Sequence, residues 1–200
     1  MQPYNEYHRR VLADAGFDVT QELDLGTTGI AGLAGRGLLV GNTRALWPIF
    51  IAARKGDAEL LASPDPLDLY TERTITRAFP AARAWFAHRR YDGAYLPFQR
   101  IAVTAGLGAL APTQLVIHPT YGPWFALRAL VALDGAPPPP AKPLIYRCAG
   151  ECETRLAEAL QTDDWHAWLA VRDACCVGRE FRYGDSQLAY HYTKALDLLS

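Results

Sequence analysis

The sequence predicts an α/β (α+β) fold in which helices flank a mixed sheet. Three observations favour this class: short apolar runs bounded by glycine or proline, segments with apolar side chains at helical spacing between those runs, and a hydrophobic fraction of 50%. A chain of 200 residues is near the usual size of one domain. The helices and strands are therefore expected to pack around one core.

The N-terminal part alternates between helix and strand patterns. Residues 1–15 carry apolar side chains at helical spacing, and the five glycines of residues 26–37 predict a loop. Residues 37–41 form a short apolar run between glycines, which is typical of a buried strand. Asn42 and Thr43 are residue types that cap helices, so a helix is expected to begin after them.

The middle of the chain is expected to contain two helices and three strands. The helices are expected over residues 68–78, after a proline-rich break, and over residues 98–105, which Pro97 opens. The strands are expected over residues 83–90, 114–118 and 125–133. Because only the turn 119–123 separates the last two strands, they are expected to pair as a hairpin.

A run of four prolines at residues 137–140 marks the clearest boundary in the chain. It predicts an α/β core over residues 1–136, a proline-rich linker over 137–143 and a C-terminal part over 144–200 that packs on the core. The C-terminal part is expected to hold one strand and then three helices, over residues 144–147, 153–160, 164–176 and 186–199.

The charge balance excludes several classes of partner. The 20 basic and 21 acidic residues give a net charge of -1, so the chain has no overall positive field for nucleic acid or an anionic membrane. No apolar run reaches the ~20 residues that a membrane-spanning helix needs, and the polar start does not resemble a signal peptide. A cytoplasmic protein with no nucleic-acid or membrane partner is expected.

Four cysteines lie in the last third of the chain: Cys148, Cys152, Cys175 and Cys176. Two of them are adjacent, where a mutual disulfide is strained, so a reducing compartment fits better than a disulfide framework. Cys148 and Cys152 could hold zinc or part of an iron–sulfur cluster, but no second pair stands at metal spacing. The alternative, partly buried free thiols, leads us to expect no metal site.

His118 is the histidine that stands out as a candidate site residue. It is expected at the end of a strand, just before a turn rich in proline and glycine, where a side chain can point into a cleft. The alternative is a histidine that only caps the turn. Tyr121, Trp124 and Phe125 crowd the same turn beside Gly122 and could wall a flat apolar ligand, although core packing explains them equally well.

Residues 114–133 resemble the cobalamin-processing proteins of the human cblC type (methylmalonic aciduria and homocystinuria type C). The resemblance lies in the order and spacing of Ile117-His118-Pro119, Tyr121-Gly122, Trp124-Phe125-Ala126 and Arg128. Further segments agree in order, namely residues 38–50, 65–68, 165–173 and 187–190. The same region, with Gly106 and Gly108 ahead of it, is more distantly similar to the cobalamin-binding half of epoxyqueuosine reductase.

This resemblance implies a flavin-reductase or nitroreductase-like fold that binds cobalamin with its lower base displaced from cobalt. It implies an enzyme that removes the upper ligand: cyanide by reduction with a reduced flavin (FMN or FAD), and alkyl groups by attack of a glutathione thiolate. The protein would supply positioning and desolvation, while the bound molecule supplies the difficult chemistry.

The resemblance also assigns candidate roles to individual residues. It places the corrin pocket at His118, Pro119, Tyr121, Gly122, Trp124 and Phe125, and thiol-substrate binding at Arg155 and Arg172. An arginine fork is a natural clamp for a carboxylate, but a surface helix charge explains each arginine at least as well. No catalytic residue is assigned.

The chain departs from its apparent relatives in three respects. It is shorter than the human type between Tyr91 and Gln114, which bears on the dealkylation pocket, and it lacks that family's long C-terminal tail. Asp92 falls where the catalytic acid of epoxyqueuosine reductase would lie, but its surroundings differ. The iron–sulfur motifs of that enzyme are absent from the sequence.

Two alternative functions stay open at this point. The first is a carrier that hands cobalamin to a cobalamin-dependent enzyme or transporter without turnover. The second is a flavin-dependent oxidoreductase that keeps the fold but has no corrin site. A homodimer is compatible with any of the three, and the sequence leaves open which upper ligand or thiol is used.

Overall fold

A computed structural model describes residues 4–146 and 151–199 of the chain. Its main sheet has four strands in the order β1 (Val19–Asp24), β2 (Arg36–Asn42), β8 (Ala126–Leu133) and β3 (Ala84–Phe86). Each pair of neighbours in this sheet is antiparallel. The predicted α/β class is confirmed. The main sheet itself, however, is antiparallel throughout and not mixed.

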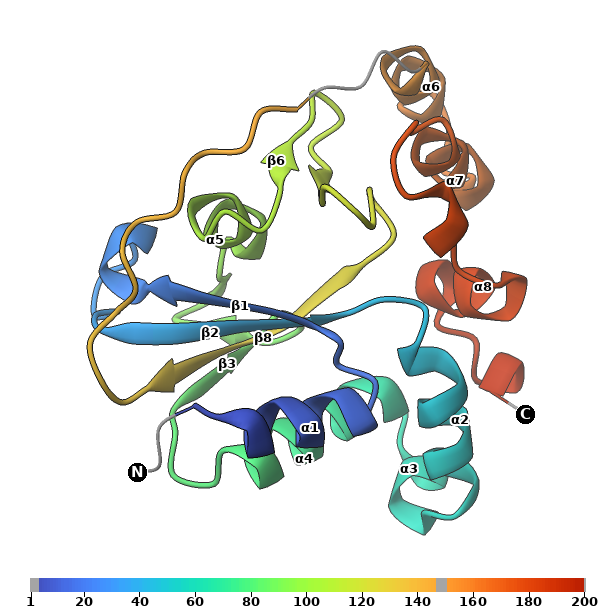
Figure 1. Cartoon of the computed structure of the whole chain (residues 1–200). Coiled ribbons are helices and arrows are strands. Elements are labelled where there is room, and N and C mark those ends of the chain that lie inside the picture. The colour runs from blue at the N-terminus through green and yellow to red at the C-terminus, as the bar shows by residue number, and fades with distance from the viewer. Residues whose placement is uncertain (1–3, 147–150, 200) are drawn as a thin grey trace.

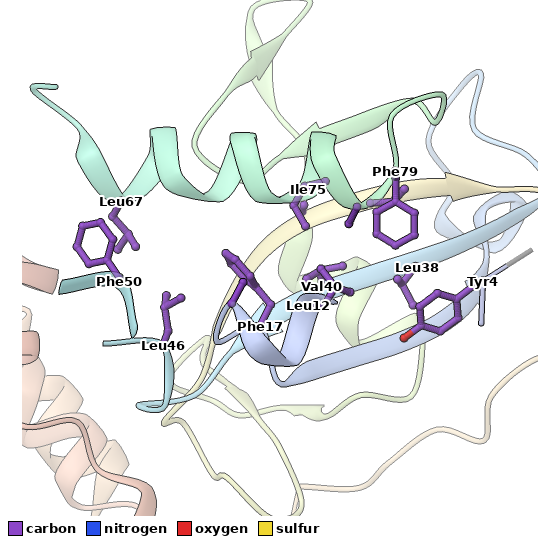
Figure 2. Packing of buried hydrophobic residues seen from close by; sticks show 14 of the residues in the cluster. Tyr4, Leu12, Phe17, Leu38, Val40, Leu46, Phe50, Leu67, Ile75 and Phe79 are labelled. Carbon is purple, nitrogen blue, oxygen red and sulfur yellow. The ribbon is translucent and has the colours of Figure 1, made fainter. Parts of the chain in front are cut away.

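One face of the sheet packs against the helices α1 (Glu6–Asp14), α2 (Leu46–Lys55) and α4 (Pro66–Ala78). Leu12 of α1 and Ile75 of α4 are fully buried against Leu38 and Val40 of β2. Figure 2 shows these side chains pointing toward one another across the layer. The short helix α3 (Ala58–Ala62) connects α2 to α4.

The opposite face of the sheet is covered by a 3₁₀ turn, η1 (Leu25–Thr28), and by α5 (Phe98–Thr104). Leu39 of β2 and Leu130 of β8 bury this face, whereas Leu38 and Val40 bury the other. Because side chains alternate along a strand, a strand covered on both faces must be apolar at every position. The predicted buried strand over residues 37–41 is confirmed for this reason.

The hairpin predicted between residues 114–118 and 125–133 is wrong. The first segment contributes only β7 (Val116–Ile117), which pairs with β6 (Ala109–Leu110) in a separate two-stranded sheet. The second segment forms β8 between β2 and β3. The turn after β7 closes locally, since His118 and Gly122 exchange backbone hydrogen bonds of 2.9 Å in both directions.

Besides α3 and β6, two further parts of the fold were not predicted. One is the edge strand β1, whose buried side chains Val19 and Leu23 are only two among six residues. The other is the hairpin of β4 (Arg90–Tyr91) and β5 (Ala94–Tyr95), in which Asp92 and Gly93 both have positive φ. An Asp-Gly pair is a strong hairpin signal that was present in the sequence.

The C-terminal helices run along one side of the molecule (Figure 1). They are α6 (Cys152–Ala159), α7 (Trp165–Asp173) and α8 (Asp185–Thr193), with 3₁₀ turns at Arg179–Phe181 and Leu196–Leu199. The predicted strand 144–147 is wrong for residues 144–146, which form no strand, and Arg147 lies outside the described residues. None of the described helices has the length and apolar character to cross a membrane.

The C-terminal part contacts the core through specific polar bonds. The Trp47 indole donates to the Ser186 hydroxyl at 3.1 Å, and Arg54 donates to the carbonyl of Leu199 at 3.0 Å. Residues 136–146 cross from β8 to the C-terminal helices without helix or strand, as Figure 1 shows. The division at residues 137–143 stays a prediction.

Candidate functional site

The turn after β7 is held together by the side chain of His118. Its Nδ1 accepts hydrogen bonds from the backbone N–H groups of Thr120 at 3.0 Å and Tyr121 at 3.2 Å. A neutral imidazole that accepts at Nδ1 carries its proton on Nε2. His118 therefore caps the turn with one nitrogen and offers a hydrogen-bond donor with the other.

Aromatic contacts fix the plane of the His118 ring. Tyr121 stacks on it with ring centres 4.4 Å apart, and Phe125 meets it edge-on at 5.8 Å. Burial lowers the pKa of His118 below its ordinary value, so the ring is neutral near pH 7. Neutrality is what the capping bonds require, because a protonated Nδ1 could not accept them.

The other edge of His118 faces a cavity of about 230 Å³, which we call the turn cavity. Its walls are mostly apolar, and it is lined by Ala109, Ile117, His118, Pro119, Leu144, Ile145, Tyr146 and Val177. Ile145 keeps 73% of its surface exposed although it lines the cavity. An exposed apolar side chain at a cavity wall is available to cover an apolar ligand.

Gly122 is needed for packing within the protein. A Cβ added there would lie 1.9 Å from the carbonyl oxygen of Val177, and one added at Gly178 would lie 2.2 Å from the backbone of Tyr121. Both glycines also have positive φ, +57° and +72°. The close approach expected here for a flat ligand is instead made by the chain itself, where the turn meets the segment after α7.

A second cavity, of about 320 Å³, has Pro123 and Phe125 of the same turn in its wall. We call it the arginine cavity because two arginines lie in its wall; it is lined by Ala87, Phe98, Gln99, Leu115, Val116, Pro123, Phe125, Ala126, Leu127, Arg128, Arg172 and His191. Phe125 thus contacts His118 on one side and the arginine cavity on the other. The segment 114–133, which carries the resemblance to the cblC-type proteins, therefore borders both cavities.

Arg172 comes from α7 and is buried, with 6% of its surface exposed. Its guanidinium donates to the carbonyl of Pro123 and lies over the rings of Trp124 at 4.8 Å and Tyr183 at 5.3 Å. Its Nε has no hydrogen-bond partner among the described residues. Arg172 thus ties α7 to the turn while part of its donor capacity is unused.

A β-bulge places Arg128 in the arginine cavity. Val40 pairs with Ala129 and Gly41 pairs with Leu127, so Arg128 is left without a partner in the ladder between β2 and β8. Bulges re-aim a side chain in this way. The Arg128 Nε donates to Oδ1 of Asn42 at 2.7 Å.

The expectation that Asn42 caps the helix α2 is therefore wrong. Its side-chain oxygen accepts from Arg128 instead. Thr43 accepts from the N–H of Ala45 at 3.2 Å, but Ala45, the N-cap residue of α2, provides no side-chain cap. The helix begins nonetheless, because Leu46 and Phe50 are buried in the core.

His191 of α8 lies in the wall of the arginine cavity together with Arg128 and Arg172. Burial, together with the positive charges of Arg172 and Arg128, lowers the pKa of His191 to about 3. The imidazole is therefore neutral at every physiological pH. Next to it, burial raises the pKa of Tyr183, whose ring lies under the Arg172 guanidinium at 5.3 Å.

Four predicted site residues line neither cavity: Tyr121, Gly122, Trp124 and Arg155. Trp124 is 1% exposed and packs with Leu169, Tyr183 and Leu188, so its ring is part of the core. Arg155 on α6 is exposed and pairs with Glu158 at 2.9 Å and Glu151 at 3.8 Å. The structure thus brings His118, Pro119, Phe125 and Arg172 to the cavities, with Tyr121 and Gly122 behind them.

Two of the cysteines, Cys152 and Cys175, contact residues that line the turn cavity. Cys152 is buried, and its Sγ lies 3.1 Å from the hydroxyl of Tyr146. Cys175 is buried against Ile117, whereas Cys176 is exposed. Cys148 lies outside the described residues. Within residues 4–146 and 151–199, no three His, Cys, Asp or Glu side chains are grouped closely enough to hold a metal ion.

Asp92 is a turn residue and not a residue of the candidate site. It is exposed at the tip of the β4–β5 hairpin, with φ of +51°. Its position is explained by the turn, where Asp and Gly tolerate positive φ.

Sequence reasoning did not single out Arg128 and His191 as site residues. Arg128 stood in the segment 114–133, but the bulge that turns it into the cavity has no signal in residue spacing. His191 reaches the cavity only because α8 packs beside β8, a contact between residues far apart in the chain.

Two cavities, of about 230 and 320 Å³, thus adjoin the turn at residues 118–125 of this α/β fold. The chain has the fold of the C. elegans B12-trafficking protein CblC, a human MMACHC homologue. The two structures share a TM-score of 0.68 at 14% sequence identity, over 97% of this chain and 94% of that one. The predicted resemblance is confirmed at the level of the fold.

A weaker likeness is to epoxyqueuosine reductase from Bacillus subtilis, with a TM-score of 0.41 and 15% identity. It covers 75% of this chain and 50% of that one. No model of a known protein family matches the sequence. No curated protein shows significant sequence similarity to it.

Proposed function

We propose that this protein binds cobalamin with its lower base displaced and removes the upper ligand, by reductive decyanation, thiol-dependent dealkylation or both. The observation that carries the proposal is the position of residues 117–128. This segment resembles the cblC-type proteins in sequence, and it borders the turn cavity and the arginine cavity. The likeness of the fold to a B12-trafficking protein supports the same reading.

The lining of the turn cavity suits one edge of a corrin ring, which is larger than the cavity itself. A corrin presents apolar methyl groups and amide side chains at its edge, and the cavity offers mostly apolar walls with two polar side chains, His118 and Tyr146. Because Nδ1 is occupied by two backbone donors, His118 would hydrogen-bond to an amide oxygen rather than ligate cobalt. The lower face of cobalt would then carry neither the base nor this histidine.

The proposed reaction follows from that coordination. Without a lower ligand the cobalt is easier to reduce, and its upper face is open to a nucleophile. In decyanation, an electron from a reduced flavin goes to cobalt and cyanide leaves as the anion. In dealkylation, a thiolate forms a bond to the alkyl carbon, and the electrons of the cobalt–carbon bond stay on the metal.

We further propose that Arg172 and Arg155 bind the thiol substrate through its carboxylates. Arg172 supports this role because it lines the arginine cavity and keeps an unused donor. Arg155 would have to exchange its partners Glu158 and Glu151 for the substrate. Such exposed ion pairs are weak, so Arg155 can exchange them for a substrate carboxylate.

The test is to mix the purified protein with cyanocobalamin and record the absorbance spectrum, then add reduced flavin and measure free cyanide. We expect conversion to the base-off spectrum on binding and protein-dependent release of cyanide. Methylcobalamin with glutathione tests dealkylation in the same way, read as the methyl thioether. A base-off spectrum without loss of either ligand would identify a carrier, and no spectral response would reject cobalamin as the ligand.

A further inference from the structure

We propose that the arginine cavity is a binding site for a single anionic group, a phosphate or a carboxylate, borne on a ligand with an apolar or aromatic portion. The inference deepens the proposed function and rests on it for Arg172, and it adds Arg128 and His191 to the same site. Three groups carry the inference: Arg128, Arg172 and the neutral imidazole of His191, all of which line the same space of about 320 Å³.

The two guanidiniums lack acidic partners. Among the described residues, no carboxylate lies within the 4.0 Å of an ion pair from Arg128 or Arg172. Asp68 interacts with Arg128 only at longer range, and its carboxylate lies 3.5 Å from the ring of His88. Buried positive charge without a counter-ion is costly, so an anion that enters the cavity recovers part of that cost.

One free donor belongs to a residue of this cavity. Arg172 is 6% exposed, and its Nε has no hydrogen-bond partner in the described chain. Buried donors are nearly always satisfied in native proteins. Charge-assisted bonds to an anion would satisfy the guanidinium.

The backbone is shaped to deliver one of these charges. The bulge in β8 leaves Arg128 out of the ladder, and Asn42 fixes its Nε at 2.7 Å, which leaves the terminal nitrogens for a ligand. Bulges that re-aim a side chain are typical of binding sites. A regular strand would have paired residue 128 and turned its side chain elsewhere.

The other walls define what the anion must be attached to. Phe98, Leu115, Val116 and Phe125 line the cavity opposite the arginines, and Gln99 is the uncharged polar group beside them. No acidic side chain lines the cavity, so nothing there would balance an ammonium group. A planar aromatic group joined to a phosphate fits this lining better than a small zwitterion.

The first test uses inorganic phosphate alone. The melting temperature is measured in phosphate and in sodium chloride at matched ionic strength, since a ligand that binds only the folded state raises it. We expect phosphate to stabilise the wild type beyond chloride, and Arg128→Gln and Arg172→Gln to abolish that difference. Arg44→Gln, which removes one exposed charge, is the matched control and should keep it.

Arg172→Gln also removes the bond to Pro123 and can unfold the protein for that reason, so Arg128→Gln decides the outcome in that case. Arg128→Gln also removes the bond to the buried Asn42, so the difference between phosphate and chloride, and not the melting temperature without phosphate, decides the test. Phosphate stabilisation that survives both variants, or none in the wild type, would overturn the site.

The second test identifies the source of the anion. Cobalamin carries a phosphodiester in its nucleotide tail, whereas cobinamide lacks the tail. If the tail is the source, Arg128→Gln should weaken cobalamin binding about tenfold and leave cobinamide within about twofold. If the thiol is the source, glutathione binding should fall about tenfold instead. Unchanged affinity for both ligands would refute the site.

These results separate the two proposals. A chain that shows arginine-dependent stabilisation by phosphate but no cobalamin spectrum has the anion site and not the proposed function. If the protein binds cobalamin and neither arginine substitution changes the affinity, the proposed function stands and the anion site does not.

Discussion

His118 serves the fold and a candidate ligand with different atoms of one ring. Nδ1 accepts from two backbone N–H groups of its own turn, while the opposite edge borders the turn cavity. The two interpretations of this residue, as a cap and as a site residue, are therefore compatible. The cap sets the tautomer, and the tautomer sets the donor that a ligand would meet.

We expect His118→Ala to weaken cobalamin binding about tenfold, since it removes one hydrogen bond to the ligand and loosens the turn that presents Phe125. His166→Ala is the matched control, because His166 is exposed and pairs with Asp164 at 2.7 Å. Affinity is read from absorbance titration. Small and equal effects of the two substitutions would remove His118 from the site.

For single residues, the sequence could indicate the turn but not which of its side chains face a cavity and which pack in the core. His118 and Phe125 are visible as a polar and an aromatic residue beside proline and glycine. Trp124 looks the same in sequence, yet it is in the core because Tyr183 and Leu188, about 60 residues later, pack on it. Only the folded chain distinguishes such residues.

At the level of elements, the contact between the turn and the segment after α7 joins the two ends of the site. Gly122 and Gly178 face each other backbone to backbone, with no room for a side chain at either position. This contact fixes α7, and therefore Arg172, relative to the turn. The positions of the two cavities depend on it.

Gly122→Ala is expected to destabilise the protein by about 2–4 kcal/mol, of which about 1 reflects positive φ and the rest the clash with Val177. Gly29→Ala is the matched control, because Gly29 also has positive φ but nothing lies within 4 Å of its added Cβ. It should cost only about 1 kcal/mol. The measurement is chemical denaturation of both variants; equal losses would mean that the contact is not tight.

Elements with strong local signals could be predicted from the sequence, whereas pairing between distant segments could not. The helix over residues 68–78 and the strand over residues 37–41 follow from local spacing, and the structure has both. The partner of residues 125–133 depends on which strands reach it in space, so proximity in the chain gave the wrong hairpin.

Across the whole molecule, three buried histidines link stability to pH. Burial lowers the pKa values of His8, His118 and His191, the last to about 3. In the unfolded chain these groups return to the ordinary value near 6.5. The unfolded state therefore binds more protons below pH 6.5, and the folded protein loses stability as the pH falls through that value.

His191 should contribute most of this effect, with a loss of about 2 kcal/mol between neutral pH and pH 5. We expect His191→Gln to remove that part of the pH dependence. His166→Gln, at an exposed site, should leave it unchanged. The free energy of unfolding at pH 7.5 and pH 5 decides the matter, and an identical pH slope in wild type and His191→Gln would contradict the account.

The central claim is that the turn at residues 118–125 holds a corrin at the turn cavity. A crystal structure of the protein with bound cobalamin tests this most directly. The account predicts the ring against His118 and Pro119, with no bond from His118 to cobalt and the lower base displaced. A ring bound elsewhere, or cobalt ligated by His118, would contradict it.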